Sequence, residues 1–143
     1  MTFRLAFNEE GFKLDKEVIT TDRAPAPVGP YSLGVKTGNL VFVSGTVGLD
    51  SQGKMAGDGS VTAQTRQAFE NIKAVLEAAG GSLENVVKVT VFLTDPEGYA
   101  DMNAVRAEYF PKDPPASSAF AVKRLIPPDL CVEIEAVAAL PCV

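Results

Sequence analysis

Apolar positions recur along the chain with a helical period in two places. The clearer one predicts a helix over residues 62–79, where apolar side chains line one face and charged side chains fall mostly elsewhere. The pair Gly80–Gly81 follows at once and supplies a stop, because glycine accepts the left-handed geometry of a helix C-terminus. A second helix is predicted over about residues 97–110, since residues 95–97 offer an N-cap aspartate, a proline for the first turn and an acid.

Shorter apolar runs predict strands. The segment 87–93 alternates most clearly, with three valines and a leucine on one face. Four further runs, bounded mostly by glycine, proline or asparagine, are predicted as strands at residues 33–36, 40–47, 120–126 and 130–139. A Gly38–Asn39 pair joins the first two of these as a hairpin, and residues 3–7 carry a weaker strand signal.

This order of elements predicts an α+β domain, in which a mixed sheet of about six strands carries two helices on one face. Two helices cannot cover both faces of such a sheet, and an uncovered apolar face usually marks an interface. We therefore expect identical subunits to cover the second face, with any small-molecule site lying where the subunits meet.

The composition fits one globular domain over residues 1–143, since 46% of the residues are hydrophobic and 22% are charged. The net charge of −5 and the lack of a basic cluster argue against nucleic acid as a partner. No apolar run approaches the roughly 20 residues that span a bilayer, and the N-terminus is acidic where a signal peptide needs an apolar core. The sequence predicts a cytoplasmic protein with no membrane partner, in which Cys131 and Cys142 are reduced thiols.

The absence of histidine restricts the chemistry of any active site. The chain contains none, so a Ser-His-Asp or Cys-His nucleophile system and a histidine-ligated metal site are excluded as usually built. Carboxylates, hydroxyls, tyrosine, arginine and backbone groups remain. No metal site is predicted.

Six motifs, in order along the chain, resemble those of one known family. They are GPYS at Gly29–Ser32, GNLVFVSGTVGLD at Gly38–Asp50, and the segments Gln64–Gly80, Val86–Asp95, Asn103–Phe110 and Val132–Ala138. Together they resemble the reactive intermediate deaminase (Rid) family, also called RidA/YjgF or endoribonuclease L-PSP-like, from about Thr20 to Leu140. Residues 1–19 then form an N-terminal extension.

The resemblance implies a chorismate-mutase-like fold, a homotrimer with clefts between subunits and no cofactor. It also implies hydrolysis of 2-imino or enamino acids to 2-keto acids and ammonia. The family's cleft positions are matched here by Tyr31, Ser44, Gly45, Asn103 and Glu133. Glu133 is the candidate catalytic residue, because a glutamate can orient a water or receive its proton. The other four are candidate substrate-binding residues.

Each of these positions also has a purely structural interpretation. Alternation puts Glu133 on one strand face with Glu135, where carboxylates are often simply solvated. The Ser44–Gly45 pair fits strand-end turn chemistry equally well, and Tyr31 could pack beside Pro30. Cys131 is interpreted as a small buried side chain and not as a nucleophile.

At one position the chain departs from the deaminating members. Where they read P-A-R-S, this chain has Pro115-Ala116-Ser117-Ser118, so Ser117 replaces the arginine that holds the substrate carboxylate. Loss of a charged hydrogen bond costs about 1.5–3 kcal/mol, or about tenfold to more than a hundredfold in binding. The sequence therefore predicts weak or absent hydrolysis of 2-iminobutanoate-like compounds, and a gain when Ser117 is replaced by arginine.

A second departure is Arg106, where the family commonly has tyrosine. The predicted helix places it within the apolar stripe, one turn after Asn103. Arg106 is either a relocated anchor for an anionic ligand or a structural partner of Glu133 or Glu135. In both cases we expect it to point into the cleft between subunits.

Three functions stay open at this point. The first is a cofactor-free deaminase that acts on small imines or enamines. The second is a trimer that binds a small, anionic metabolite without turning it over, which the loss at Ser117 favours. The third gives assembly the main role, with residues 1–19 bracing the trimer or docking a partner.

Overall fold

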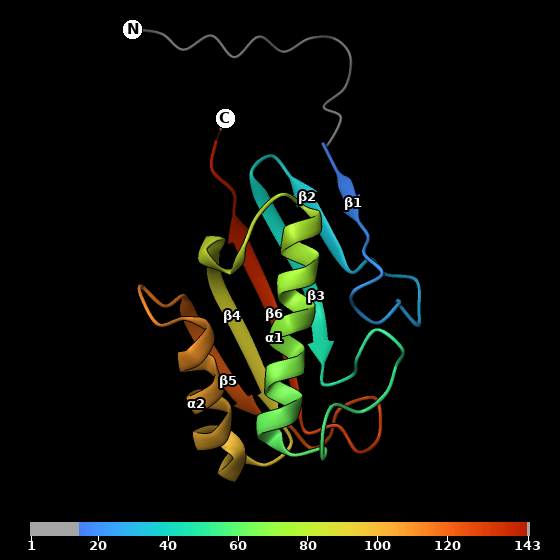
Figure 1. The fold of residues 1–143 in the computed structure, drawn as a ribbon, viewed down its shortest axis with the longest axis vertical. Coiled ribbons are helices and arrows are strands. Elements are labelled where there is room, and N and C mark those ends of the chain that lie inside the picture. The colour runs from blue at the N-terminus through green and yellow to red at the C-terminus, as the bar shows by residue number, and fades with distance from the viewer. Residues whose placement is uncertain (1–14, 143) are drawn as a thin grey trace, which may run out of the picture.

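The computed structural model describes residues 15–142. Its elements follow the predicted order, with one additional strand near the N-terminus (Figure 1). The strands are β1 (Glu17–Ile19), β2 (Gly34–Thr37), β3 (Leu40–Val47), β4 (Val86–Leu93), β5 (Ala116–Ala121) and β6 (Val132–Ala139). The helices are α1 (Val61–Ala78) and α2 (Tyr99–Tyr109). Two short 3-10 turns precede β4 and α2, at Leu83–Asn85 and Pro96–Gly98. The predicted strand at residues 3–7 lies outside the described residues.

The six strands form one mixed sheet in the order β1-β2-β3-β6-β4-β5. All neighbouring pairs are antiparallel except β4 and β5, which are parallel. The last strand of the chain, β6, therefore lies in the middle of the sheet between β3 and β4. The end of the predicted N-terminal extension is part of this sheet, because residues 17–19 form β1 and pair with β2.

One strand prediction is wrong in its bounds. Residues 120–126 were expected to be extended, whereas β5 spans Ala116–Ala121. The reason is that β4, its only partner, ends at Leu93, which is opposite Ala121. Residues beyond Ala121 have no ladder to continue and instead form the loop that contains Pro127 and Pro128.

Side-chain caps supplied by the sequence start α1 and the 3-10 turn that precedes α2. The Ser60 hydroxyl accepts a hydrogen bond from the backbone N–H of Ala63 at the start of α1. The Asp95 carboxylate accepts one from Glu97 and so caps the 3-10 turn that leads into α2. Gly80 ends α1 with φ +85°, a conformation that favours glycine.

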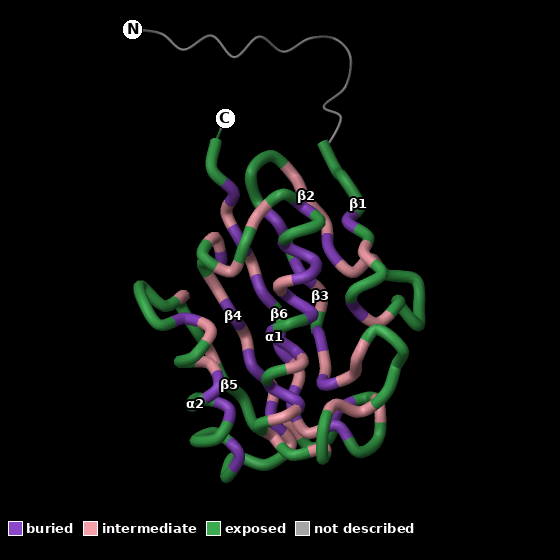
Figure 2. The backbone as a smooth tube through the Cα atoms, viewed as in Figure 1, coloured by how far each residue is buried: buried purple, intermediate pink, exposed green. Residues whose placement is uncertain are grey.

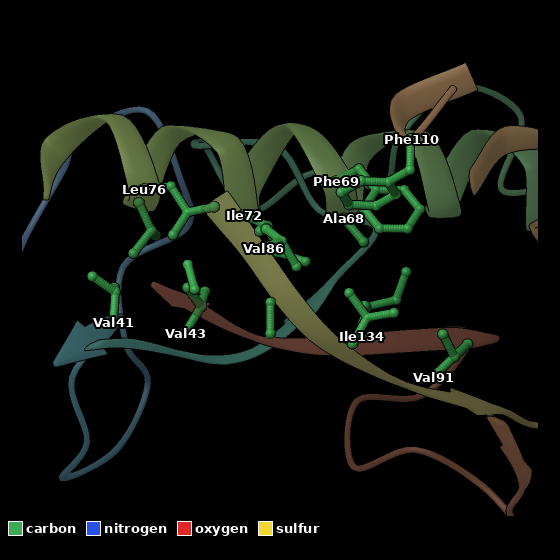
Figure 3. Close-up of a cluster of buried hydrophobic side chains, with 14 of the residues drawn as sticks. Val41, Val43, Ala68, Phe69, Ile72, Leu76, Val86, Val91, Phe110 and Ile134 are labelled. Carbon is green, nitrogen blue, oxygen red and sulfur yellow. The ribbon is translucent and has the colours of Figure 1, made fainter. Parts of the chain in front are cut away.

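The core lies between the helices and one face of the sheet (Figures 2 and 3). Ile72 and Leu76 of α1 point toward Val41 and Val43 of β3, and all four are buried. Phe69 packs edge-on against Phe110 with ring centroids 5.5 Å apart, which joins α1 to the end of α2. Within residues 15–142, no helix has the length and apolar character to cross a membrane.

The opposite face of the sheet is uncovered, as the helix count predicts. Strand alternation assigns buried Val132 and Ile134 to the helix side and Glu133 and Glu135 to the open side. Large apolar side chains are also exposed on this face, with Leu40 37%, Phe42 46% and Phe120 53% exposed. Phe120 stacks on Phe92 of the neighbouring strand at 6.1 Å. We call this surface the open face.

Candidate functional site

Ser44 and Gly45 form a β-bulge inside β3, and not the turn at the end of a strand that was one interpretation of the pair. Val43 pairs with Ala136 and Thr46 pairs with Ile134, so two residues of β3 lie opposite the single residue Glu135 of β6. Bulges bend a strand and change the direction of its side chains, and they are frequent beside active sites. Here the bulge brings Gly45 against the side chain of Glu133.

The Glu133 side chain lies directly over Gly45. A Cβ placed on Gly45 would lie 2.1 Å from a carboxylate oxygen of Glu133, far inside van der Waals contact. Burial raises the pKa of the Glu133 carboxyl above its usual range, and the negative charge of nearby Glu135 raises it further. A carboxyl with a raised pKa is a stronger base once it is ionised, as proton abstraction from water requires.

The bulge also holds the loop that carries Tyr31. The Ser44 hydroxyl donates a hydrogen bond to the carbonyl of Ser32, and the Ser44 N–H donates to the carbonyl of Leu33 at 3.0 Å. Tyr31 is 50% exposed, and its hydroxyl accepts from the N–H of Val28 at 3.3 Å. The hydroxyl of Ser44 therefore positions the loop, and Tyr31 remains accessible beside it. We call Tyr31, Ser44, Gly45 and Glu133 the bulge group.

An open hollow of about 350 Å³ lies beside Glu133. Gly45, Glu133 and Glu135 line one part of it, and Phe92 and Arg124 line another. This hollow opens on the uncovered side of the sheet. It provides space for a small ligand next to the candidate base.

The remaining predicted residues gather at the other end of the sheet, where α2 crosses the edge strand β5. The Arg106 guanidinium donates from Nη1 to the Ser117 hydroxyl at 2.6 Å. Its Nε donates to the side-chain oxygen of Asn103 at 3.2 Å, and Nη2 donates to the same oxygen. We call Asn103, Arg106 and Ser117 the edge group.

Arg106 does not pair with Glu133 or Glu135 of its own chain, so the predicted pairing with one of them is possible only between subunits. Both glutamates lie on the open face of β6, whereas α2 packs on the helix face and so cannot reach them. Three ion pairs occur among residues 15–142, and none includes Arg106. Its charge is met there only by neutral oxygens.

The bulge group and the edge group cannot form one site within a single chain. Ser117 is opposite the buried Val89 and so faces the helix side, whereas Glu133 faces the open side. The two strands are also separated by β4, which at about 4.8 Å per strand interval gives roughly 10 Å. One copy of the chain therefore holds the predicted site residues as two separate groups.

Comparison with known proteins agrees with this arrangement of motifs. A family model described as Endoribonuclease L-PSP matches residues 21–140. The chain belongs to the endoribonuclease L-PSP family. This is the family to which the Rid proteins belong, and the predicted resemblance is confirmed.

Several relatives in the L-PSP family are similar over most of their length. A RutC family protein of Pyrococcus horikoshii is 51% identical over 123 residues, which are 86% of this chain and 97% of the relative. The 3-aminoacrylate deaminase RutC of Acinetobacter baylyi is 41% identical, with 87% and 98% covered. The 2-iminobutanoate/2-iminopropanoate deaminase of Dermatophagoides farinae is 38% identical, with 85% and 94% covered.

Solved structures of L-PSP family members show the same fold. RidA from the Antarctic bacterium Psychrobacter superposes with a TM-score of 0.82 at 45% identity, covering 87% of this chain and 99% of that one. E. coli TdcF with bound serine gives a TM-score of 0.82 at 40% identity, with 87% and 99% covered. The predicted α+β fold, with its mixed six-stranded sheet and two helices, is thereby confirmed.

The sequence motifs did not identify two residues that lie beside the edge group and the bulge group, Tyr99 and Arg124. Tyr99 accepts a hydrogen bond from Arg106 Nη2 at 3.3 Å, and its ring lies 5.9 Å from the guanidinium carbon. The helical spacing of Tyr99, Asn103 and Arg106 is the signal that could have found it. Arg124 lines the hollow beside Glu133 from the loop after β5, and no motif marked it.

Replacing Gly45 by alanine should destabilise the protein by about 1 kcal/mol, the low end of overpacking costs, because the Glu133 carboxylate must turn aside from the added methyl group. In a protein that already carries Glu133→Ala, the same change should cost much less, since the overlapping atoms are gone. Chemical denaturation of the four proteins in this cycle measures the difference. Equal costs in both backgrounds would show that Glu133 does not lie over Gly45.

Proposed function

We propose that this L-PSP family member is a cofactor-free deaminase that hydrolyses the carbon–nitrogen bond of small imino or enamino carboxylates. We further propose that it works as a homotrimer, in which each site joins the bulge group of one copy to the edge group of the next. The observation that carries the proposal is Arg106, a guanidinium whose hydrogen bonds among residues 15–142 all go to neutral side chains. Its positive charge is therefore available to an anion from outside the chain.

The position of Arg106 changes the expectation drawn from Ser117 alone. Weak hydrolysis was expected because Ser117 cannot supply the charge of an arginine. Arg106 brings a guanidinium from α2 to 2.6 Å from the Ser117 hydroxyl, so a cation is present beside this position after all. The names of two relatives, a 3-aminoacrylate deaminase and a 2-iminobutanoate/2-iminopropanoate deaminase, describe small carboxylates of the kind that this cation would bind.

Exposed apolar surface supports assembly into the proposed trimer. Leu40, Phe42 and Phe120 are partly exposed on the open face. Burial of apolar area of this kind against a second copy is favourable by about 25 cal/mol per Å². Since the two groups face opposite sides of the sheet, a neighbouring copy is also the means of bringing a Glu133 near an Arg106.

The proposed reaction needs only water besides the substrate. The substrate carboxylate binds Arg106 of one copy, with its carbon–nitrogen double bond toward Glu133 of the neighbour. Glu133 accepts a proton from water while the water oxygen bonds to the carbon, and this proton passes to the nitrogen. This gives a carbinolamine, whose hydroxyl proton then passes through Glu133 to the nitrogen as the carbon–nitrogen bond breaks, so that one imine and one water give one ketone and one ammonia.

A direct assay tests this proposal. The purified protein should speed the release of 2-oxobutanoate from freshly generated 2-iminobutanoate above the rate in buffer. Arg106→Gln should reduce this rate by about tenfold to more than a hundredfold, because a charged hydrogen bond is lost. Arg66→Gln is the matched control, since Arg66 forms an exposed ion pair with Glu108 and should leave the rate unchanged.

Two results would contradict the proposal. The first is a wild-type rate equal to that of buffer; if 2-oxobutanoate still binds, the protein is the non-catalytic metabolite-binding trimer that the sequence left open. The second is a stable monomer in light scattering, which would remove the proposed site altogether.

A further inference from the structure

We propose that Arg106 and Ser117 act as one composite carboxylate anchor, in which Ser117 is a ligand-contacting residue and Asn103 and Tyr99 are positioning residues. The anchor rests on the proposed function, because it specifies how that site holds its substrate. It differs from a plain guanidinium fork, since the two donors offered to the carboxylate come from two different side chains. It also removes Asn103 from the set of residues that touch the substrate.

The hydrogen-bond donors of Arg106 are nearly all committed within the chain. A guanidinium carries five N–H groups. Nε donates to Asn103, and Nη2 donates to both Asn103 and Tyr99. One N–H of Nη1 donates to Ser117, which leaves a single N–H on Nη1 for a ligand. Arg106 alone therefore cannot hold a carboxylate through two parallel hydrogen bonds.

Ser117 supplies the second donor. Its oxygen accepts from Arg106, so the hydroxyl hydrogen remains available, and no acceptor for it is found among residues 15–142. Ser117 lies on the outer edge strand of the sheet and is exposed to solvent. The free N–H of Nη1 and the free O–H of Ser117 start from atoms 2.6 Å apart, so the two oxygens of one carboxylate can each accept one of them.

The positions of Asn103 and Tyr99 explain why the guanidinium is fixed. Tyr99, Asn103 and Arg106 lie on one face of α2 at spacings of four and three residues, where side chains of a helix meet. Asn103 bridges two nitrogens of the guanidinium, and the Tyr99 ring adds a cation–π contact at 5.9 Å. The side-chain oxygen of Asn103 is thus occupied by Arg106.

This anchor favours a ligand that is negatively charged and that carries two hydrogen-bond acceptors side by side. A carboxylate offers two acceptor oxygens and a negative charge, whereas a primary amide offers one acceptor and an N–H₂ group that would face the donors. We expect a small monocarboxylate to bind and its neutral amide to bind far more weakly. Together with the proposed reaction, this gives a substrate class of 2-imino acids and 3-aminoacrylate-like enamino acids with a free carboxylate.

Titration calorimetry with 2-oxobutanoate as the probe, and 2-oxobutanamide as the neutral control, tests the anchor. Arg106→Gln should weaken binding about tenfold to more than a hundredfold, and Ser117→Ala about twofold to tenfold. The double variant should bind no more weakly than Arg106→Gln alone, because the hydroxyl acts only beside the guanidinium. Ser117→Thr, which keeps the hydroxyl, should bind within about twofold of the wild type.

Asn103→Leu provides a separate readout of positioning. It should weaken binding of 2-oxobutanoate in the wild-type background and have no further effect in Arg106→Gln, since its role passes through the guanidinium. If Asn103 touched the ligand directly, the loss would persist in both backgrounds, and this result would overturn the assignment. Unchanged affinity in Ser117→Ala, additive losses in the double variant, or equal binding of 2-oxobutanamide would overturn the composite anchor.

The binding assay separates this inference from the proposed function. A protein that binds 2-oxobutanoate with the expected pattern but does not hydrolyse imines retains the anchor and loses the proposed deaminase activity. A protein that hydrolyses imines while Arg106→Gln and Ser117→Ala bind normally retains the activity and loses the anchor. A wild type that does not bind 2-oxobutanoate at all contradicts the anchor directly.

Discussion

Glu133→Gln should lower the deaminase rate by about 10²–10⁴-fold, the usual contribution of a general base, without lowering the stability of the protein at neutral pH. Glutamine keeps the shape of the side chain over Gly45 but cannot accept a proton. Burial and the charge of Glu135 raise the pKa of Glu133, so folding disfavours its ionised form. Removal of that charge should leave the neutral-pH stability unchanged or increased.

The sign of the pH dependence follows from the same shift. Because the pKa of Glu133 is higher in the folded protein than in the unfolded chain, the folded protein binds more protons between the two values. Its stability therefore falls as pH rises through that window, and this fall should be absent in Glu133→Gln. Activity should run in the opposite direction, increasing with pH as Glu133 ionises.

Glu135→Gln is the matched control for this prediction. It changes the neighbouring carboxylate on the same strand face and leaves the candidate base in place. Since the charge of Glu135 raises the pKa of Glu133, its removal should shift the acid limb of the pH–rate profile to lower pH while the plateau rate is kept. If Glu135→Gln abolished activity and Glu133→Gln did not, the assignment of the base would be wrong.

Periodicity alone predicted the elements that carry the core. The helix expected at 62–79 spans Val61–Ala78, and the strand expected at 87–93 spans Val86–Leu93, because both contain long, regular apolar stripes. The short strand β1 was missed, since three residues are too few for a period to show. The bounds of β5 depend on where its partner β4 ends, which the local pattern of residues 120–126 does not contain.

The candidate site divides in the same way. The sequence motifs were enough to identify Glu133, Gly45 and Ser117 as candidate site residues. The contact between Gly45 and Glu133, however, depends on the register of β3 with β6. That register joins strands that are nearly ninety positions apart in the sequence, for example at Thr46 and Ile134. Helical or strand periodicity predicts contacts only between residues that are close in the sequence, so it could not predict this contact.

The hydrogen bonds of Arg106 also could not be predicted from the sequence. Helical geometry correctly placed Arg106 near Asn103, but its contact with Ser117 depends on how α2 crosses the edge strand. Pairing of Arg106 with Glu133 or Glu135 of the same chain was plausible only while the face of each element was unknown. Once α2 is placed on the helix side, the open-face glutamates are excluded within the chain.

The most direct test of a site shared between copies is complementation between inactive variants. Arg106→Gln keeps an intact bulge group, and Glu133→Gln keeps an intact edge group. If each site joins the two groups from neighbouring copies, trimers formed by refolding an equal mixture contain some sites with both groups intact. Such a site needs the correct variant on each side, so random assembly should restore about a quarter of the wild-type activity.

A parallel mixture provides the control. Arg106→Gln refolded with the double variant Arg106→Gln/Glu133→Gln contains no intact edge group, so it should stay inactive whatever the arrangement of the copies. The account predicts recovery to about a quarter in the first mixture and none in the second. No recovery in the first mixture, with mixed trimers demonstrated by differential tagging, would contradict the claim that one copy holds only two separate halves of the site.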